Sequence, residues 1–239
     1  MNTAIILAAG KGTRVGGSVP KQFIEFNGKP VLAYTAEIFE QDPNIDSIEI
    51  VCHKDWVPYV RKMAAEFNLS KVRWLTEGGS TFQESVVNGV FSLRESLSPD
   101  DIAVISFGAA PMTPREDIDD SIRVCREHGN GIAARDIDLC TCIKDDEYGS
   151  SQSIIRENLK GFANPWTFRY GELCEAYDTA IARGMLGNIE PHTTSLYFAL
   201  GKRLWFSRCT SPCAKITTRQ DLELFEGYLL LKDRQKRTD

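Results

Sequence analysis

The sequence predicts an α/β fold in which a mostly parallel sheet carries helices on both faces and a β-hairpin arm projects from it. Short, continuously apolar runs have the character of parallel strands that are buried on both sides. Segments with apolar residues at helical spacing follow these runs, so strand and helix alternate along the chain. The 239 residues, 42% of them hydrophobic and 26% charged, have the composition of an ordinary globular domain.

The first expected strand covers residues 4–9 (AIILAA), an apolar run that ends at Gly10. Residues 31–40 repeat apolar side chains every three or four positions and are therefore expected to form a helix. The same two patterns alternate as far as residue 137. Further strands are expected at 47–52, 72–75, 102–107 and 131–137, and further helices at 56–68, 82–96 and 117–128.

The alternation stops between residues 139 and 155. Two short extended runs there flank a polar turn near residues 145–151, which predicts the hairpin arm, and such an arm is suited to a subunit contact. Neither an internal repeat nor a linker divides the chain, so we expect residues 1–239 to form a single domain with a dimerisation arm near 139–155. The elements expected after the arm are a helix at 170–183, a strand at 203–209 and a helix at 218–232.

Charge and composition exclude several classes of partner. The formal net charge of −5 argues against nucleic acid or an anionic membrane as the main partner, so a phosphorylated ligand requires a local basic pocket. No apolar run is long enough for a signal peptide or a membrane span. The seven cysteines fit neither a zinc-site nor a disulfide spacing, so we expect reduced thiols in a cytoplasmic protein.

The segment after the first strand, residues 8–17 with Pro20-Lys21-Gln22 behind it, has the composition of a phosphate-binding loop. Its alanines and glycines allow the backbone to approach a ligand closely, and consecutive backbone N–H groups can cradle phosphate oxygens. Arg14 and Lys21 add two cations, enough to neutralise a triphosphate and its departing pyrophosphate. The candidate nucleotide-binding residues of the loop are Ala8, Ala9, Gly10, Lys11, Gly12 and Thr13.

Two commoner glycine motifs do not fit this loop. The dinucleotide-binding pattern G-x-G-x-x-G requires a glycine where Val15 stands, and neither Gly10 nor Gly12 begins a Walker A sequence. A glycine-rich turn with solvated basic side chains is the alternative interpretation. The buried strand before the loop favours ligand binding instead, because open parallel sheets bind ligands at the carboxyl ends of their strands.

The loop resembles the nucleotide loop of the sugar-phosphate nucleotidyltransferases, and specifically of the cytidylyltransferases that act on methylerythritol phosphate and ribitol phosphate. LAAGKGTR at 7–14 and PKQF at 20–23 carry this resemblance. It covers nearly the whole chain and implies a Rossmann-like fold and a homodimer formed through the projecting arm. The other matching strings are KPVL at 29–32, HKDW at 53–56 (closer to the ribitol-phosphate branch), GG at 78–79, SVVNG at 85–89, KITT at 215–218 and DL at 221–222.

The resemblance implies transfer of CMP from CTP to a polyol or sugar phosphate, of the ribitol 5-phosphate or 2-C-methyl-D-erythritol 4-phosphate type, with release of pyrophosphate. By their match, Arg14 and Lys21 hold the β- and γ-phosphates and stabilise the pentacoordinate α-phosphorus. Lys215 approaches the same phosphorus from the opposite side. The implied nucleotide-binding residues beyond the first loop are Gly79, Ser80 and Ser85.

Three residues are candidates for contacts with the acceptor. Arg156 matches an arginine that reaches across the dimer to the phosphate of the acceptor. Thr217 belongs to the matching KITT string. His192 stands, with Pro191, where the family has a threonine–aspartate pair, so it is either a replacement acceptor group or a structural histidine.

Several metal- and acceptor-binding residues of the family are absent. Residues 106–111 (SFGAAP) replace a string like HDAARP, so Phe107 stands in place of a magnesium-binding aspartate and Ala110 in place of an acceptor-binding arginine. Phe82 likewise replaces a basic residue, and Asn164 replaces a threonine.

The loss of the aspartate leaves the metal-binding residues unassigned, because a phenylalanine cannot ligate a hard cation. We expect Mg²⁺ to arrive with the triphosphate, held mostly by its oxygens and by water. Asp136 or Asp138 are the alternative ligands.

Two other functions stay open at this point. A non-catalytic homologue that binds a nucleotide or sugar phosphate is favoured by Phe107. An enzyme that uses UTP or GTP is the other, because the first loop also resembles those of uridylyl and guanylyl enzymes. Arg14, Lys21 and Lys215 together favour an active cytidylyltransferase, since a binding protein has no need of cations on both sides of the α-phosphorus.

Overall fold

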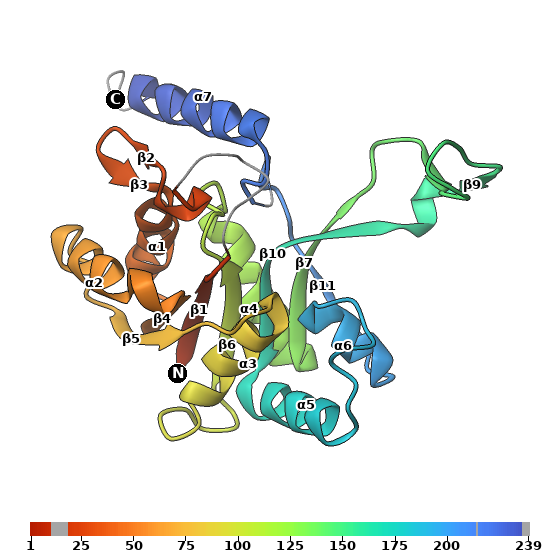
Figure 1. Cartoon of the computed structure of the whole chain (residues 1–239), viewed down its shortest axis with the longest axis horizontal. Helices are drawn as coiled ribbons and strands as arrows, with labels where there is room; N and C mark the ends of the chain where they lie inside the picture. Colours follow the sequence, from red (N-terminus) through yellow and green to blue (C-terminus); the bar gives the residue numbers. More distant parts are fainter. Residues whose placement is uncertain (11–18, 214, 236–239) are drawn as a thin grey trace.

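The computed structural model describes residues 1–10, 19–213 and 215–235, and it contains a seven-stranded sheet in the order β11-β7-β10-β6-β1-β4-β5 (Figure 1). Strand β1 pairs in parallel with β4 and β6, β4 with β5, and β7 with β11. Strand β10 runs antiparallel to both of its neighbours, so the predicted mostly parallel sheet is confirmed. The strands of this sheet are β1 (Asn2–Ala8), β4 (Ser47–Cys52), β5 (Val72–Glu77), β6 (Ile102–Phe107), β7 (Asn130–Asp136), β10 (Lys160–Arg169) and β11 (Phe206–Ser207).

Helices cover both faces of the sheet, as the alternation predicted (Figure 1). The helices are α1 (Val31–Gln41), α2 (Val57–Glu66), α3 (Phe82–Ser92), α4 (Arg115–His128), α5 (Tyr170–Ala182), α6 (Thr193–Ala199) and α7 (Arg219–Gln235). The remaining short elements are β2 (Glu25–Phe26), β3 (Lys29–Pro30), β8 (Thr141–Ile143), β9 (Gln152–Ile154) and the 3₁₀ turns η1 (Lys21–Phe23), η2 (Lys54–Trp56) and η3 (Arg156–Asn158).

The burial of strand β1 on both faces of the sheet explains why its sequence is almost continuously apolar. Its side chains alternate between the two faces, and both faces are buried. Ala4 and Ile6 belong to a core shared with α1, α2 and α4, whereas Ile5 and Leu7 belong to a second core shared with α3, α5 and α6. The loop that follows β1 therefore starts from a rigid point at the centre of the sheet.

Strand β10 was not predicted from the sequence. Its ten residues include Pro165, which cannot donate to a strand ladder and is normally confined to edges and irregularities. The register on β7 shifts between Phe162 and Trp166, so the proline lies where the ladder is interrupted. The short helix α6 was also missed, and the strand expected at 203–209 contains only the two residues Phe206–Ser207.

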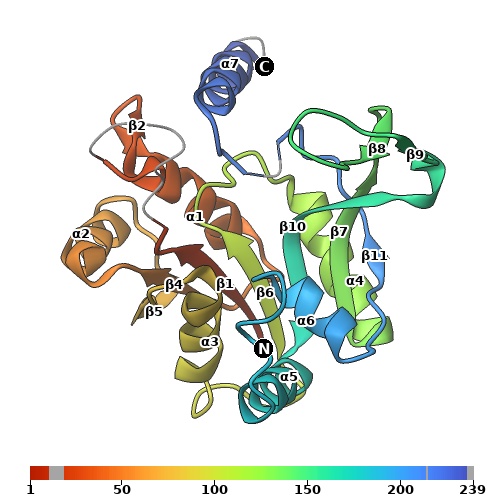
Figure 2. The same ribbon diagram turned by 45° about the vertical axis from the view of Figure 1, so that its right-hand side comes forward.

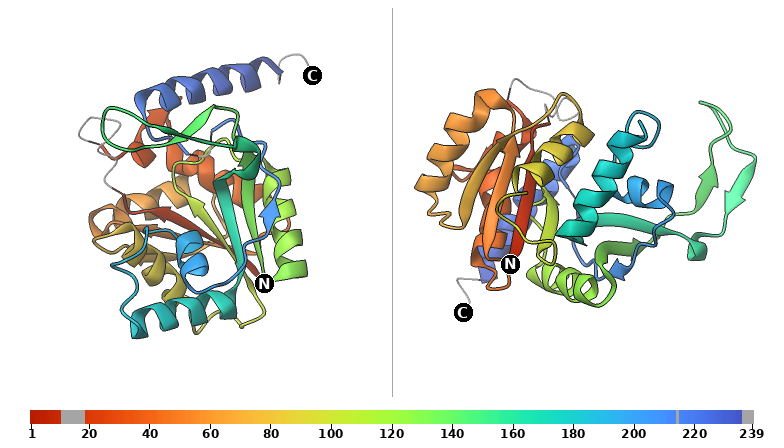
Figure 3. Two further views of the ribbon diagram at one scale, coloured as in Figure 1. Left: turned by 90° about the vertical axis from the view of Figure 1, so that its right-hand side faces the viewer. Right: turned by 90° about the horizontal axis from the view of Figure 1, so that it is seen from below.

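The predicted hairpin arm is confirmed as the antiparallel pair β8–β9, which projects from the sheet (Figure 3). Its turn is held by the Asp146 carboxylate, which accepts hydrogen bonds from the backbone N–H groups of Tyr148 and Gly149. Large apolar side chains on the arm are exposed, with Leu139 77% and Tyr148 92% accessible. Within the described residues, no helix combines the length and apolarity needed to cross a membrane.

Candidate active site

Three adjoining cavities lie beyond the carboxyl ends of β1 and β6, which point to the same edge of the sheet (Figure 2). The central cavity, about 200 Å³, is lined by Leu7, Ala8, Gly10, Lys21, Gln22, Phe82, Phe107, Gly108, Ala109, Lys215 and Thr217. The α3 cavity, about 550 Å³, is lined by Leu7, Ala9, Gly10, His53, Lys54, Glu77, Gly78, Gly79, Ser80, Thr81, Phe82 and Ser85. The α6 cavity, about 370 Å³, is lined by Phe107, Phe162, Trp166, Glu190, His192, Thr194, Ser195, Phe198 and Lys215.

The central cavity brings together two lysines from opposite ends of the chain. Lys21 opens η1, and its ammonium donates a hydrogen bond to the carbonyl oxygen of Ile216. The Lys215 ammonium lies 4.1 Å from the centre of the Phe107 ring, a cation–π distance. None of the described residues that line this cavity carries a carboxylate, so it is suited to a phosphate group.

The buried amide of Gln22 holds the start of the first loop. Its Nε2 donates hydrogen bonds to the carbonyl oxygens of Ala8 (2.7 Å) and Gly10 (2.8 Å), one on each side of Ala9. This positioning role was not predicted, although Gln22 directly follows Lys21 in the PKQ string. Lys11, Gly12, Thr13 and Arg14, which were predicted to contact the nucleotide, lie outside the described residues.

The α3 cavity places the double glycine against the first loop. A Cβ at Gly78 would collide with the Cβ of Ala9, so only glycine permits this approach. The backbone N–H of Gly79 donates to the Ser85 hydroxyl (3.1 Å), which in turn donates to the Thr81 carbonyl (2.9 Å). Ala9, Gly79 and Ser85, predicted to contact the nucleotide, therefore line one cavity.

Helix α3 begins with a capping box that also involves Ser80. Thr81 accepts a hydrogen bond from the backbone N–H of Glu84, and the Glu84 carboxylate accepts from the N–H of Thr81. The same carboxylate accepts from the backbone N–H and the hydroxyl of Ser80. These hydrogen bonds lower the pKa of Glu84, and they fix the segment that forms one wall of the α3 cavity.

The α6 cavity contains His192, one of the predicted acceptor contacts, and it shares Lys215 with the central cavity. The His192 ring packs beside Trp166 and Phe82, with ring centres 5.6 and 5.4 Å away. Burial lowers the pKa of His192; Glu190 opposes this shift and the Lys215 ammonium adds to it. The imidazole is therefore neutral near pH 7.

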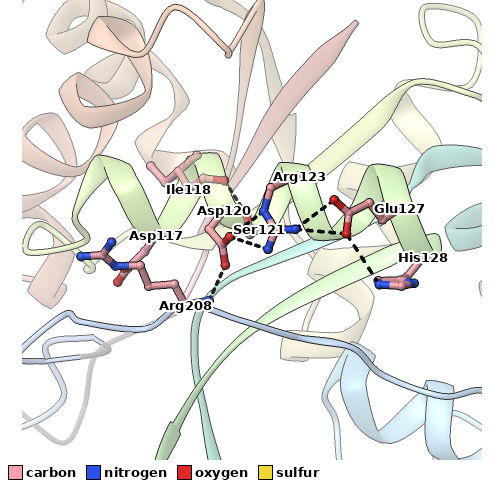
Figure 4. A network of polar contacts seen from close by, with 8 residues as sticks. All are labelled: Asp117, Ile118, Asp120, Ser121, Arg123, Glu127, His128 and Arg208. Atoms are coloured by element: carbon pink, nitrogen blue, oxygen red, sulfur yellow. Dashed lines mark hydrogen bonds and ion pairs between the residues drawn. The ribbon is translucent and has the colours of Figure 1, made fainter.

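The segment that carries Lys215 is anchored to α4 and to the loop after β6. The buried Asp117 carboxylate accepts hydrogen bonds from the backbone N–H and hydroxyl of Thr210. The Asp120 carboxylate accepts a hydrogen bond from the backbone N–H of Arg208 (Figure 4). The backbone N–H of Ile216 then donates to the Ala109 carbonyl at 2.7 Å. This anchor was not predicted from the sequence, because its partners are about ninety residues apart.

The other end of this segment is held by Asp221. Burial opposes its ionisation, but hydrogen bonds from the N–H groups of Thr218 and Thr217 outweigh that effect and lower its pKa. Thr217, a predicted acceptor contact, lines the central cavity and not the α6 cavity.

Arg156 and the two alternative metal ligands lie apart from these cavities. Arg156 begins η3 beside the arm, where its guanidinium donates to the Asp138 carbonyl at 2.8 Å. Asp136 pairs with Lys160 at 2.7 Å. Neither aspartate lines any of the three cavities, and no group of three or more acidic, histidine or cysteine side chains within the described ranges is placed to hold a metal ion.

Comparison with known proteins identifies the class of protein that this fold and site define, the nucleotidyltransferases. Residues 2–230 match the family model of 2-C-methyl-D-erythritol 4-phosphate cytidylyltransferase (IspD). A ribitol-5-phosphate cytidylyltransferase of Lacticaseibacillus paracasei is 35% identical over 98% of this chain and 100% of its own length. A 2-C-methyl-D-erythritol 4-phosphate cytidylyltransferase of Clostridium novyi is 33% identical, over 95% of this chain and 96% of its own.

Solved structures agree with the sequence comparisons on the fold. The crystal structure of the Francisella tularensis 2-C-methyl-D-erythritol 4-phosphate cytidylyltransferase superposes with a TM-score of 0.77 at 24% identity, covering 93% of this chain and 97% of that one. The chain belongs to the IspD family of cytidylyltransferases.

Proposed function

We propose that the protein transfers CMP from CTP to a small polyol or sugar phosphate. A phosphate oxygen of the acceptor attacks the α-phosphorus, the bond from that phosphorus to the oxygen bridging to the β-phosphate breaks, and pyrophosphate leaves. The observation that carries this proposal is the meeting of Lys21 and Lys215 in one cavity without a carboxylate among its described lining residues. Reactions of this kind depend mainly on positioning and charge neutralisation.

The three cavities suit the three parts of this reaction. The α3 cavity, with Gly79, Ser80 and Ser85 on its wall, would take the nucleoside. The central cavity would take the phosphates, with Lys21 and, from the first loop, Arg14 as cations. The α6 cavity adjoins it through Lys215 and would take the acceptor.

Magnesium enters this proposal as part of the Mg·CTP substrate. A hard divalent cation needs oxygen ligands, and Phe107 offers none at the position where the sequence resemblance implies an aspartate. The described lining of the central cavity offers the amide of Gln22 and the hydroxyl of Thr217 but no carboxylate. We therefore assign no metal ligand to this chain.

We also propose a cytoplasmic homodimer formed through the arm. Exposed apolar side chains such as Leu139 and Tyr148 are costly in water and favour a protein contact. Arg156, which lines none of the cavities of its own chain, would then act on the acceptor phosphate in the partner subunit.

The test is pyrophosphate release from CTP, UTP or GTP with magnesium and a panel of phosphorylated polyols and sugars. We expect turnover with CTP, and Lys21→Ala should reduce kcat/KM by about 100-fold or more, because a preorganised charge at the transition state is removed. Glu95→Gln, on the distant surface, is the control. CTP binding without turnover would instead support a non-catalytic homologue. Turnover with UTP or GTP but not with CTP would support a nucleotidyltransferase that uses another nucleoside triphosphate.

A further inference from the structure

The Lys215 ammonium lies where two of the three cavities meet. Lys215 and Phe107 are the two described residues that line both the central and the α6 cavity. The ammonium lies over the Phe107 ring, 4.1 Å from its centre, so the positive charge is placed on the negative face of the ring. Phe107 ends β6, the middle strand of the sheet. The lysine and the ring therefore form one unit at the border between the cavities.

The Phe107 ring is itself held by other rings. The Trp166 ring meets it edge to face, with centres 5.1 Å apart and planes at 80°, and the Phe82 ring centre lies 6.1 Å away. Phe107, Trp166 and Phe162, the last two from β10, form the aromatic wall of the α6 cavity. Trp166 is only 3% exposed, so it supports the Phe107 ring from inside the protein.

The backbone of Phe107 is fixed as well. Its N–H donates a hydrogen bond to the side-chain carbonyl of buried Asn164 at 3.1 Å, and the Asn164 amide donates to the Thr113 hydroxyl at 2.9 Å. Phe82, Phe107 and Asn164 are three of the positions at which this chain departs from the strings that it resembles. The three departures thus meet at the ring that contacts Lys215.

A ring face and a carboxylate hold an ammonium group with different consequences. A carboxylate neutralises the ammonium by forming an ion pair, and it would repel the phosphates of a nucleotide. A ring face attracts the ammonium through its quadrupole and adds no net charge, so the lysine keeps its full positive charge. The flexible four-carbon stem of a lysine leaves the ammonium free to move, and a contact that restricts it places the charge before the reaction begins. The contact with Phe107 is thus suited to hold a cation for phosphate groups.

We propose that Phe107 is a positioning residue, whose ring face holds the Lys215 ammonium, fully charged, at the border of the central and α6 cavities. This proposal rests on the proposed transfer of CMP from CTP, and it gives a role in that reaction to a side chain that cannot bind a metal ion. Under that function the ammonium stands between the triphosphate in the central cavity and the acceptor in the α6 cavity. The rate of transfer then depends on the electron density of a ring that does not itself react.

The first experiment detects the contact itself and needs no substrate. Full-length protein, isotope-labelled at the ε carbon of lysine, is compared by NMR with its Phe107→Leu variant, and the Lys215 signal is assigned by its loss in Lys215→Met. We expect the ring current of Phe107 to shift the ε protons of Lys215 upfield, and this shift should disappear in Phe107→Leu. Lys29, whose ammonium lies 4.6 Å from the centre of the Tyr34 ring, is the internal control and should keep its own shift. An ordinary position for Lys215 in the unmodified protein, or a shift that survives in Phe107→Leu, would overturn the proposal.

The second experiment weakens the ring face while keeping the shape of the side chain. Phenylalanines with one or three fluorine atoms, which withdraw electrons from the ring face, replace Phe107 in the full-length protein. Single-turnover transfer from CTP is measured with magnesium and with ribitol 5-phosphate and 2-C-methyl-D-erythritol 4-phosphate as acceptors. We expect the rate to fall about threefold with one fluorine and about 10-fold with three, while the Kd for CTP stays within about twofold. The matched control is Phe91, whose ring lies 3.6 Å from the guanidinium carbon of Arg94 outside the three cavities; its fluorination should leave the rate unchanged.

The outcomes separate this role from the proposed function. Equal rates with the natural and both fluorinated rings, or an equal loss on fluorination of Phe91, would overturn the positioning role, and Phe107 would then only fill space. No turnover by the unmodified protein, with these two acceptors or with the wider panel, would overturn the proposed function and with it any role in transfer. The NMR comparison decides the contact between Lys215 and Phe107 independently of turnover.

Discussion

Replacing Glu49 by glutamine should stabilise the protein at pH 8 and change its stability little at pH 5. Glu49 lies in β4 and is completely buried. One carboxylate oxygen accepts hydrogen bonds from the hydroxyls of Thr76 and Ser92, while the other has no hydrogen-bond partner among the described residues. Burial raises the pKa of Glu49 from 4.5 to about 7, although both hydroxyls oppose the shift.

The magnitude follows from this difference in pKa. The unfolded chain releases the Glu49 proton near pH 4.5, whereas the folded chain retains it until about pH 7. Stability is therefore lost as the pH rises through this window, and above it the penalty is about 3 kcal/mol at 1.36 kcal/mol per pKa unit. At pH 5 the penalty is below about 1 kcal/mol. Glutamine has the shape of the protonated carboxyl and no charge, so it removes the penalty.

Urea unfolding followed by tryptophan fluorescence at pH 5 and pH 8 gives the two free energies of unfolding. The gain from Glu49→Gln should be larger at pH 8 by about 2 kcal/mol. Glu95→Gln, an exposed glutamate, should change stability by less than about 0.5 kcal/mol at either pH. A gain of equal size at both pH values, or a loss at pH 8, would refute the reasoning from burial.

Three further predictions concern the site and the arm. Gly78→Ala should raise the KM for CTP about 10-fold or more in steady-state kinetics, because the new Cβ pushes the α3 wall away from Ala9, whereas Gly187→Ala, in open space, should not. Asp117→Ala should cost about 2–4 kcal/mol in urea unfolding and lower kcat about 10-fold or more, since it removes the acceptor for the hydrogen bonds that anchor the segment of Lys215. Leu139→Ser should weaken the proposed dimer about 10-fold in sedimentation equilibrium, because it removes an exposed apolar contact of the arm.

Each of these predictions has an outcome that contradicts it. An unchanged KM for Gly78→Ala would mean that the α3 wall does not contact the nucleotide. Loss of stability in Asp117→Ala with native kcat would make this aspartate purely structural. If the unmodified protein sediments as a monomer, or if the Leu139→Ser variant dimerises normally, the arm does not form the proposed dimer contact.

The parts of the fold that the sequence predicted well are those with one consistent pattern. Strands β4 and β6 have the predicted limits, because each is a short run in which almost every residue is apolar or small; buried Glu49 in β4 is the exception. Strand β10 escaped prediction because Pro165 argues against a strand and only tertiary pairing on both sides compensates for it. A two-residue strand such as β11 has no periodicity to detect.

The site was predictable where a string of residues folds locally. The double glycine and Ser85 flank the N-terminus of α3, with Gly79 six residues before Ser85, so they come together for local reasons. The meeting of Lys21 with the segment of Lys215 spans most of the chain, and only the family resemblance indicated it. The aromatic wall of the α6 cavity depends on β10, whose position the sequence did not reveal.

The contact between Lys21 and Ile216 determines when, during synthesis and folding, the central cavity can be assembled. A chain emerging from the ribosome contains Lys21 long before Lys215 and Ile216, because the two contact residues Lys21 and Ile216 are 195 positions apart. Contacts of such long separation form late and slowly, because the intervening chain must first be ordered. A chain that stops short of residue 215 therefore lacks one of the two lysines of the central cavity, and under the proposed function it would not complete the transfer.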